Sequence, residues 1–197
     1  MGTFFVFSDY MKPALRMAAL MRTPVKFIYS HDAFRVGEDG PTHQPVEHEA
    51  QLRLMEKLQN HMGEDSLRVF RAADADEMTV CWQMAMENMD TPTALILSRQ
   101  NIKSLPEGND YQKARKGAYV VAGSDEQYDI ILLASGSEVS TLVEGAELLR
   151  KDGVRCRVVS VPSEGLFRRQ PVGYQLLVLP SEAKVFGMTA GLPVTLQ

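Results

Sequence analysis

The chain has 197 residues, which is long enough for one or two domains with apolar cores of their own. Hydrophobic residues make up 45% of it and charged residues 23%, a profile that excludes a disordered protein. The formal net charge is -4 without a block of lysines and arginines, which argues against nucleic-acid and membrane partners. No apolar run is long enough to cross a bilayer. Cys81 and Cys156 form no CxxC pair, so we expect free thiols in a reducing cytoplasm.

Short apolar runs alternate with helical patterns through the first half of the chain. Residues 4–7 predict a strand, and Asp9 is placed to cap a helix that continues to Met21. Further strands are predicted over 25–30, 67–72 and 93–98, and further helices over 46–58 and 74–89. Strands that alternate with helices predict an α/β fold, with a parallel sheet flanked by helices.

The second half begins after a polar stretch. Strands are predicted over 128–135, 154–162 and 185–191, with a helix over 138–151 that Gly153 ends and a short helix or turn over 163–169. We therefore expect a first domain over 1–110, a linker over 111–124 and a second α/β domain over 125–197. Because the chain reaches Gln197 soon after the last strand, we expect this second domain to be partial.

Three aromatic residues, Phe4, Phe7 and Tyr10, stand at the end of the first predicted strand. Burial statistics favour a role in the core for such side chains. Ligands, however, bind at the carboxyl ends of strands in open α/β sheets, where aromatic faces could hold a flat heterocycle. The residues alone leave both interpretations open.

A polar loop, HDAFRVGEDGPTHQPVE, follows the second predicted strand and contains His31, Asp39 and His43. Imidazoles transfer protons near neutral pH and bind anions when charged, whereas a solvated turn would also account for the Asp–Gly pair. The spacing matches no zinc pattern, so we predict no metal site here. Arg99 follows the strand over 93–98, where its forked donors would suit a phosphate or simply face solvent.

The segments GTFFVFSDY, YSHDAFRVGEDGPTHQPVEH and TALILSRQN occur in the order seen in transketolases. The later segments ASGSEV and VRCRVVSVPS resemble the start of the transketolase C-terminal domain. The resemblance covers nearly the whole chain. It implies the pyrimidine domain of the thiamine-diphosphate-binding fold, incomplete at its N-terminus, followed by part of the C-terminal domain.

The resemblance also implies roles for individual residues. Phe4, Phe7 and Tyr10 would line the pocket for the aminopyrimidine ring of thiamine diphosphate. His31 and Arg99 would bind the phosphate of the sugar substrate, and Asp39 would contact a hydroxyl of the donor ketose. His43 would be catalytic and assist proton movement. The reaction would be the reversible transfer of a two-carbon ketol unit from a ketose phosphate to an aldose phosphate, in the pentose phosphate pathway.

Transketolases hold Mg²⁺ and the diphosphate with a GDG…N motif on an N-terminal domain, and this chain has no such motif. We therefore expect the metal and diphosphate site on a missing N-terminal domain, a homodimeric parent protein, and no activity from the chain alone. A dihydroxyacetone synthase or deoxyxylulose-phosphate synthase fragment remains an alternative, as does a non-catalytic interaction module. HQPVE and SRQN favour transketolase over the synthase that makes deoxyxylulose phosphate.

Overall fold

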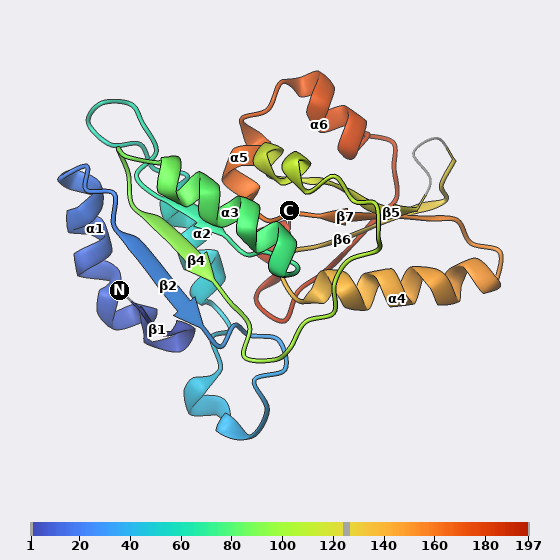
Figure 1. Cartoon of the computed structure of the whole chain (residues 1–197), viewed down its shortest axis with the longest axis horizontal. Helices are drawn as coiled ribbons and strands as arrows, with labels where there is room; N and C mark the ends of the chain where they lie inside the picture. The colour runs from blue at the N-terminus through green and yellow to red at the C-terminus, as the bar shows by residue number, and fades with distance from the viewer. Residues whose placement is uncertain (1, 124–126, 197) are drawn as a thin grey trace.

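The computed structural model describes residues 2–123 and 127–196, which form two α/β domains (Figure 1). The first domain has a four-stranded sheet in the order β1-β2-β4-β3. Its strands are β1 Gly2–Phe4, β2 Lys26–Ser30, β4 Thr93–Ile96 and β3 Arg68–Phe70. Every neighbouring pair is parallel, which confirms the predicted α/β fold.

Helices cover both faces of the first sheet. Helices α1, Lys12–Leu20, and α2, His48–Glu56, pack on the face that carries Phe27, Tyr29, Val69, Ala94 and Ile96. Helix α3, Ala75–Glu87, packs on the opposite face with Phe70 and Leu95. This division follows from the strand period of two, because neighbouring residues such as Val69 and Phe70 point to opposite faces.

The first predicted strand is shorter than its apolar run. Strand β1 ends at Phe4, and a 3-10 helix, η1, occupies Phe5–Met11. The buried residues of η1 are Phe5, Ser8 and Met11, which recur every three residues and so share one face of a 3-10 helix. Asp9 does not cap a helix as predicted; it forms an ion pair with Lys12 at the start of α1.

The second domain has a sheet in the order β5-β7-β6-β8. Its strands are β5 Tyr119–Gly123, β7 Cys156–Ser160, β6 Ile130–Ala134 and β8 Val185–Met188. Strand β5 is antiparallel to β7, and the other pairs are parallel. Helix α4, Glu138–Lys151, has the predicted bounds, while α5, Glu164–Arg168, and α6, Val172–Val178, cover the other face. Both cysteines are buried free thiols, as predicted.

The segment 111–124, expected as a linker, contains a 3-10 helix, η4 Tyr111–Lys116, and the whole of β5. In β5, Tyr119 and Val121 are buried while Val120 and Ala122 are only partly so, and this period of two belongs to a strand. The second sheet therefore begins within that segment. The expected boundary between 124 and 125 lies outside the described residues.

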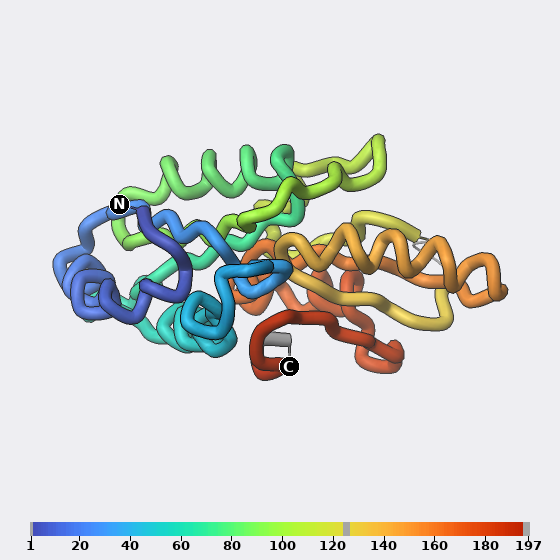
Figure 2. The backbone as a smooth tube through the Cα atoms, turned by 90° about the horizontal axis from the view of Figure 1, so that it is seen from below, coloured from blue at the N-terminus to red at the C-terminus, as the bar shows by residue number. Residues whose placement is uncertain are grey.

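The two domains share one apolar core. Phe70, Cys81 and Leu95 of the first domain belong to the same buried cluster as Tyr119, Leu132 and Val158 of the second. Figure 2 shows α3 and the following chain running above both halves of the molecule. The domains are therefore packed as one body, and the edge of the first sheet is held in a fixed place relative to α4.

Gly117 should tolerate no side chain at the junction between η4 and β5. Its φ is +86°, and an added Cβ would lie 2.3 Å from the backbone nitrogen of Phe167. A positive φ alone costs a non-glycine residue roughly 1–3 kcal/mol, and the backbone clash adds to that cost. We therefore expect Gly117→Ala to lower the free energy of unfolding by more than roughly 2 kcal/mol in urea titrations. Gly145, inside α4 with open space around it, is the matched control. Gly145→Ala should raise the free energy of unfolding by roughly 0.5–1 kcal/mol. Equal effects of the two substitutions would contradict the claim that Gly117 tolerates no side chain.

Candidate functional site

The predicted site residues follow three neighbouring parallel strands. Phe4 ends β1, His31 comes directly after β2, and Arg99 comes three residues after β4. The register pairs Phe4 with Ser30, and the backbone nitrogen of Asp32 donates to the carbonyl of Leu97 at 3.1 Å. The carboxyl ends of β1, β2 and β4 therefore meet at one edge of the sheet, the place where ligands bind in open α/β sheets.

Five of the predicted side chains form a continuous aromatic cluster. The Phe4 and His31 rings are stacked with centroids 3.7 Å apart, and the Phe7 ring meets His43 edge-on at 5.4 Å. Phe7 lies 6.1 Å from Phe4 and 6.2 Å from Tyr10. Tyr10 is 83% exposed, so the cluster opens to solvent at that end and is not part of the core.

His31 has an unusual backbone. Its φ is +61°, which L-residues rarely adopt and which costs of order 1 kcal/mol or more. The turn brings its ring over Phe4, while Nδ1 lies 3.0 Å from the Ser30 hydroxyl. The next residue, Asp32, is buried, and its Oδ2 accepts a hydrogen bond from Arg71 Nη2 at 2.8 Å. This contact fixes the strained turn in place.

The remaining two predicted residues contact each other. Two short 3-10 turns, η2 Gly37–Asp39 and η3 Pro41–His43, carry the loop past the end of β4. The Nε atom of Arg99 lies 3.5 Å from Asp39 Oδ2, and its Nη2 donates to Glu38 Oε1 at 2.6 Å. His43 Nδ1 lies 2.8 Å from the Thr42 hydroxyl. A cation, carboxylates and an imidazole thus line the loop above the strand ends.

A buried ionic cluster beneath the loop was not predicted from the sequence. Arg71, just after β3, contacts three carboxylates: Asp32 at 2.8 Å, Glu138 at 2.6 Å and Glu49 at 3.4 Å. Its Nη1 also donates to the carbonyl of Ser135 at 2.9 Å. Because Glu138 begins α4, the cluster ties the loop after β2 to the second domain. The signal in the sequence was an arginine between Phe70 and Ala72, in the run over 67–72 that predicts a buried strand.

Charges in this cluster shift one another's pKa. Burial alone would lower the pKa of the Arg71 guanidinium, but Glu49, Glu138 and Asp32 outweigh it and hold that pKa above its ordinary value. Burial raises the pKa of the Glu138 carboxyl, although Arg71 opposes the shift. Arg71 is therefore a permanent cation, and it stabilises the charged form of the carboxylates around it.

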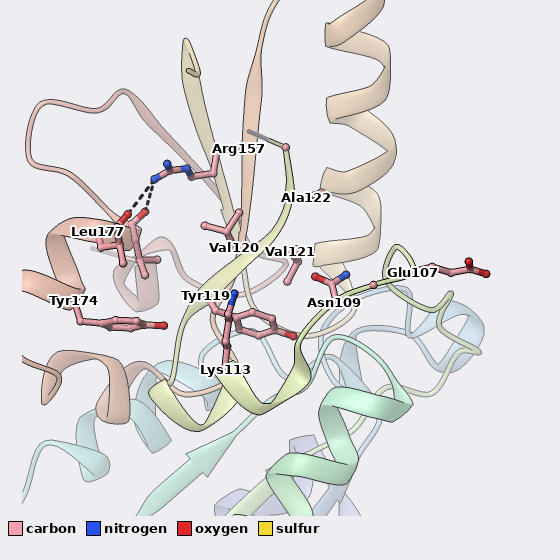
Figure 3. A pocket seen from close by; sticks show the side chains of 13 residues that line it. Glu107, Asn109, Lys113, Tyr119, Val120, Val121, Ala122, Arg157, Tyr174 and Leu177 are labelled. Atoms are coloured by element: carbon pink, nitrogen blue, oxygen red, sulfur yellow. Dashed lines mark hydrogen bonds between the residues drawn. The ribbon is translucent and has the colours of Figure 1, made fainter. Parts of the chain in front are cut away.

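A cavity of about 440 Å³ lies elsewhere, beside the edge strand β5 (Figure 3). Its walls include Lys113, Tyr119, Tyr174 and Arg157, whose Nη1 donates to the carbonyl of Leu177 at 3.1 Å. None of the seven predicted site residues lines it. The geometry thus separates this cavity from the strand-end site.

Among residues 2–123 and 127–196, one group of three side chains has the composition of a metal site: Asp9, Glu47 and His48. His48 Nε2 lies 3.2 Å from Asp9 and Nδ1 lies 3.8 Å from Glu47, so the carboxylates face opposite nitrogens of the ring. The Lys12 ammonium already contacts Asp9. No helix in the described part of the chain has the length and apolarity that a bilayer crossing requires.

Two family models match the chain. The model described as "Transketolase, pyrimidine binding domain" matches residues 1–104, and "Transketolase-like TK C-terminal domain" matches residues 117–197. A transketolase from Halalkalibacterium halodurans is 49% identical over 183 residues, which are 92% of this chain and 26% of that protein. A probable transketolase from Streptococcus pneumoniae is 46% identical over 93% of this chain and 26% of that protein.

Solved structures similar to this chain are also transketolases. Transketolase from Leishmania mexicana is 39% identical with a TM-score of 0.88, over 98% of this chain and 27% of that one. A Pichia stipitis transketolase, described as a complex with sedoheptulose-7-phosphate, is 36% identical with a TM-score of 0.86 over the same shares. The chain thus spans about a quarter of the length of these relatives. It belongs to the transketolase family and carries the family's pyrimidine-binding domain followed by its C-terminal domain.

Proposed function

We propose that this chain is the central part of a transketolase that transfers a two-carbon ketol unit reversibly from a ketose phosphate to an aldose phosphate. The observation that supports this is the meeting of the aromatic cluster and the Arg99–Asp39 pair at one edge of the first sheet. The relative described as a complex with sedoheptulose-7-phosphate supports a sugar-phosphate substrate. The named relatives are transketolases and include neither of the alternative synthases.

We assign the aminopyrimidine ring of thiamine diphosphate to the cluster of Phe4, Phe7 and Tyr10. The cluster fits such a ring because its faces are aromatic and its Tyr10 end is open. When bound, the cofactor supplies the carbanion chemistry, while the protein orients the reactants and manages charge. Mg²⁺ and the diphosphate would bind to another part of the parent protein.

The residues around the cluster would manage the substrate. Arg99 and His31 would donate to the sugar phosphate, because a dianion needs cationic or N–H donors. Asp39 Oδ2 is buried and has no hydrogen-bond partner among the described residues, which suits an acceptor for a ketose hydroxyl. His43, in contact with Phe7, would accept and return protons near the reacting carbons.

We infer a homodimeric, cytoplasmic parent protein. The buried free thiols of Cys81 and Cys156 suit a reducing compartment. Exposed Tyr10, Met17 and Met21 give the first domain an apolar surface around α1 that suits a protein partner. We keep 1–110 as the first proposed domain and move the proposed start of the second from 125 to a position before β5, Tyr119–Gly123.

A chimera tests the proposed function. The segment of the Halalkalibacterium halodurans transketolase that matches this chain would be replaced by it, and ketol transfer between sugar phosphates would be measured. We expect an active chimera in which Arg99→Met raises KM for the phosphorylated substrate roughly tenfold to hundredfold, because a charge-assisted hydrogen bond is lost. Arg115→Met, which removes an exposed ion pair with Glu87, is the matched control and should leave KM unchanged.

Two outcomes would count against the proposal. One is a folded chimera that binds thiamine diphosphate and transfers nothing, and the other is an Arg99→Met chimera with unchanged KM. The chain alone, mixed with thiamine diphosphate and Mg²⁺, should show no ketol transfer. Turnover by the purified chain would refute its expected inactivity.

A further inference from the structure

Arg99 already holds a carboxylate. Its Nη2 donates to Glu38 Oε1 at 2.6 Å. The Asp39 carboxylate, which was the predicted site residue, has its Oδ2 atom 3.5 Å from Arg99 Nε and forms no hydrogen bond with it. The Glu38 side chain is 79% exposed and the Arg99 side chain 31% exposed. Hydrogen bonds from its own backbone and from Arg99 lower the pKa of the Glu38 carboxyl, so Glu38 is ionised near neutral pH.

The backbone is shaped for this contact. Gly37 has φ of +83°, and a Cβ added there would lie 3.2 Å from Arg99 Nη1, so the guanidinium rests against the bare glycine. From the other side, the amide of Gln100 donates to the carbonyl of Arg35, which ties the turn after β4 to the loop. Two segments that are far apart in the sequence thus bring Glu38 onto the guanidinium.

A carboxylate and a phosphate compete for the same donors. Both accept from the N–H groups of a guanidinium in a fork geometry, so one Nη2 that serves Glu38 is not free to serve a phosphate oxygen in the same position. An exposed ion pair is also weak and easily broken. The Glu38 carboxylate therefore occupies the anion-binding position on the Arg99 guanidinium until a stronger anion displaces it.

We propose that Glu38 is a specificity-determining residue: its carboxylate competes for Arg99, so that a phosphate-bearing ligand displaces it more readily than a neutral sugar does. This inference rests on the proposed role of Arg99 in binding sugar phosphate. A neutral sugar brings no charge to Arg99, so it gains less than a phosphate does by replacing an ionised carboxylate. A phosphate dianion offers more charge and more acceptor oxygens than Glu38 does.

The test measures anion binding by the intact chain. Ribose 5-phosphate and inorganic phosphate are titrated separately, and binding is measured by isothermal titration calorimetry, a readout that wild type and every variant share. An exposed pair holds Arg99 only part of the time, so its removal by Glu38→Gln should tighten binding of either anion roughly twofold to sixfold. Glu107→Gln removes an acid that lines the separate cavity beside β5 and should leave the affinity unchanged.

The outcomes separate this inference from the proposed function. If Arg99→Met abolishes binding but Glu38→Gln leaves the affinity at the wild-type value, Glu38 is no competitor while the role of Arg99 stands. If Arg99→Met binds as well as wild type, or if neither wild type nor Glu38→Gln shows saturable binding, both proposals fail. Tighter binding in Glu107→Gln as well would reduce the effect to general charge and also overturn the inference.

Discussion

Replacing Arg71 with methionine is expected to lower the free energy of unfolding by about 3–5 kcal/mol. The guanidinium is fully buried and contacts Asp32, Glu138 and Glu49, and the substitution would leave these carboxylates in a region of low polarity without their cation. The loss is large because the desolvation of each carboxylate is then no longer offset. Urea titration followed by circular dichroism measures it.

The same variant tests how the domains are coupled. Arg71 belongs to the first domain, whereas Glu138 and the carbonyl of Ser135 belong to the second. Because the domains share a buried cluster, we expect wild type to unfold in a single transition, and we expect this transition to broaden or split in Arg71→Met. Arg115→Met is the matched control. It removes the exposed ion pair between Arg115 Nη1 and Glu87 Oε2, which are 2.7 Å apart, and should barely move the midpoint of the urea titration. Equal midpoints for the two variants would rule out a stabilising role for the buried cluster.

Glu77 makes stability depend on pH. Burial raises the pKa of this carboxyl from 4.5 to about 7, against the opposing effect of hydrogen bonds from the backbone of Ala73 and the hydroxyl of Ser160. In the unfolded chain the carboxyl loses its proton near pH 4.5, whereas the folded chain keeps it to about pH 7. The folded state holds the extra proton between these values, so its stability falls as the pH rises.

We expect the Glu77 contribution to lower the free energy of unfolding by about 3 kcal/mol between pH 4.5 and 7. Glu77→Gln keeps a neutral group of the same shape, so its stability should exceed that of wild type at pH 8 and approach it near pH 4.5. Urea titrations at a series of pH values would measure the difference. Glu87→Gln, at the exposed end of the same helix, should run parallel to wild type. A parallel Glu77→Gln curve would contradict the raised pKa.

Much of the fold could be predicted because its signals are local. The apolar runs of β2, β4, β6 and β7 and the amphipathic pattern of α4 appear in the sequence where the structure has them. The turn at Phe5 was missed because FFVF reads as a strand, and only the recurrence of Phe5, Ser8 and Met11 every third residue marks the 3-10 helix. Strand β5 was not predicted because it directly follows a polar stretch and its five residues are too few for a clear alternation of buried and exposed side chains.

Part of the candidate site could also be predicted, because its signals are local in the sequence. His31 and Arg99 follow apolar runs, and parallel strands place such residues at one edge. The Arg71 cluster depends on Glu49 and Glu138, which lie 22 and 67 positions away from Arg71 along the chain. The pairing with Glu49 comes from how α2 packs on the first sheet, and the pairing with Glu138 from how the two domains pack, so no local pattern contains either.

The shared core has a consequence for synthesis on the ribosome. Helix α3 is complete at Glu87, but Tyr119, Leu132 and Val158, which belong to the same core, are translated later. Until then the nascent first domain presents Val80, Cys81 and Met84 without their full cover, and exposed apolar surface of this kind attracts chaperones and invites aggregation. During synthesis the chain is therefore prone to aggregation until β7 has been made and packs into the core.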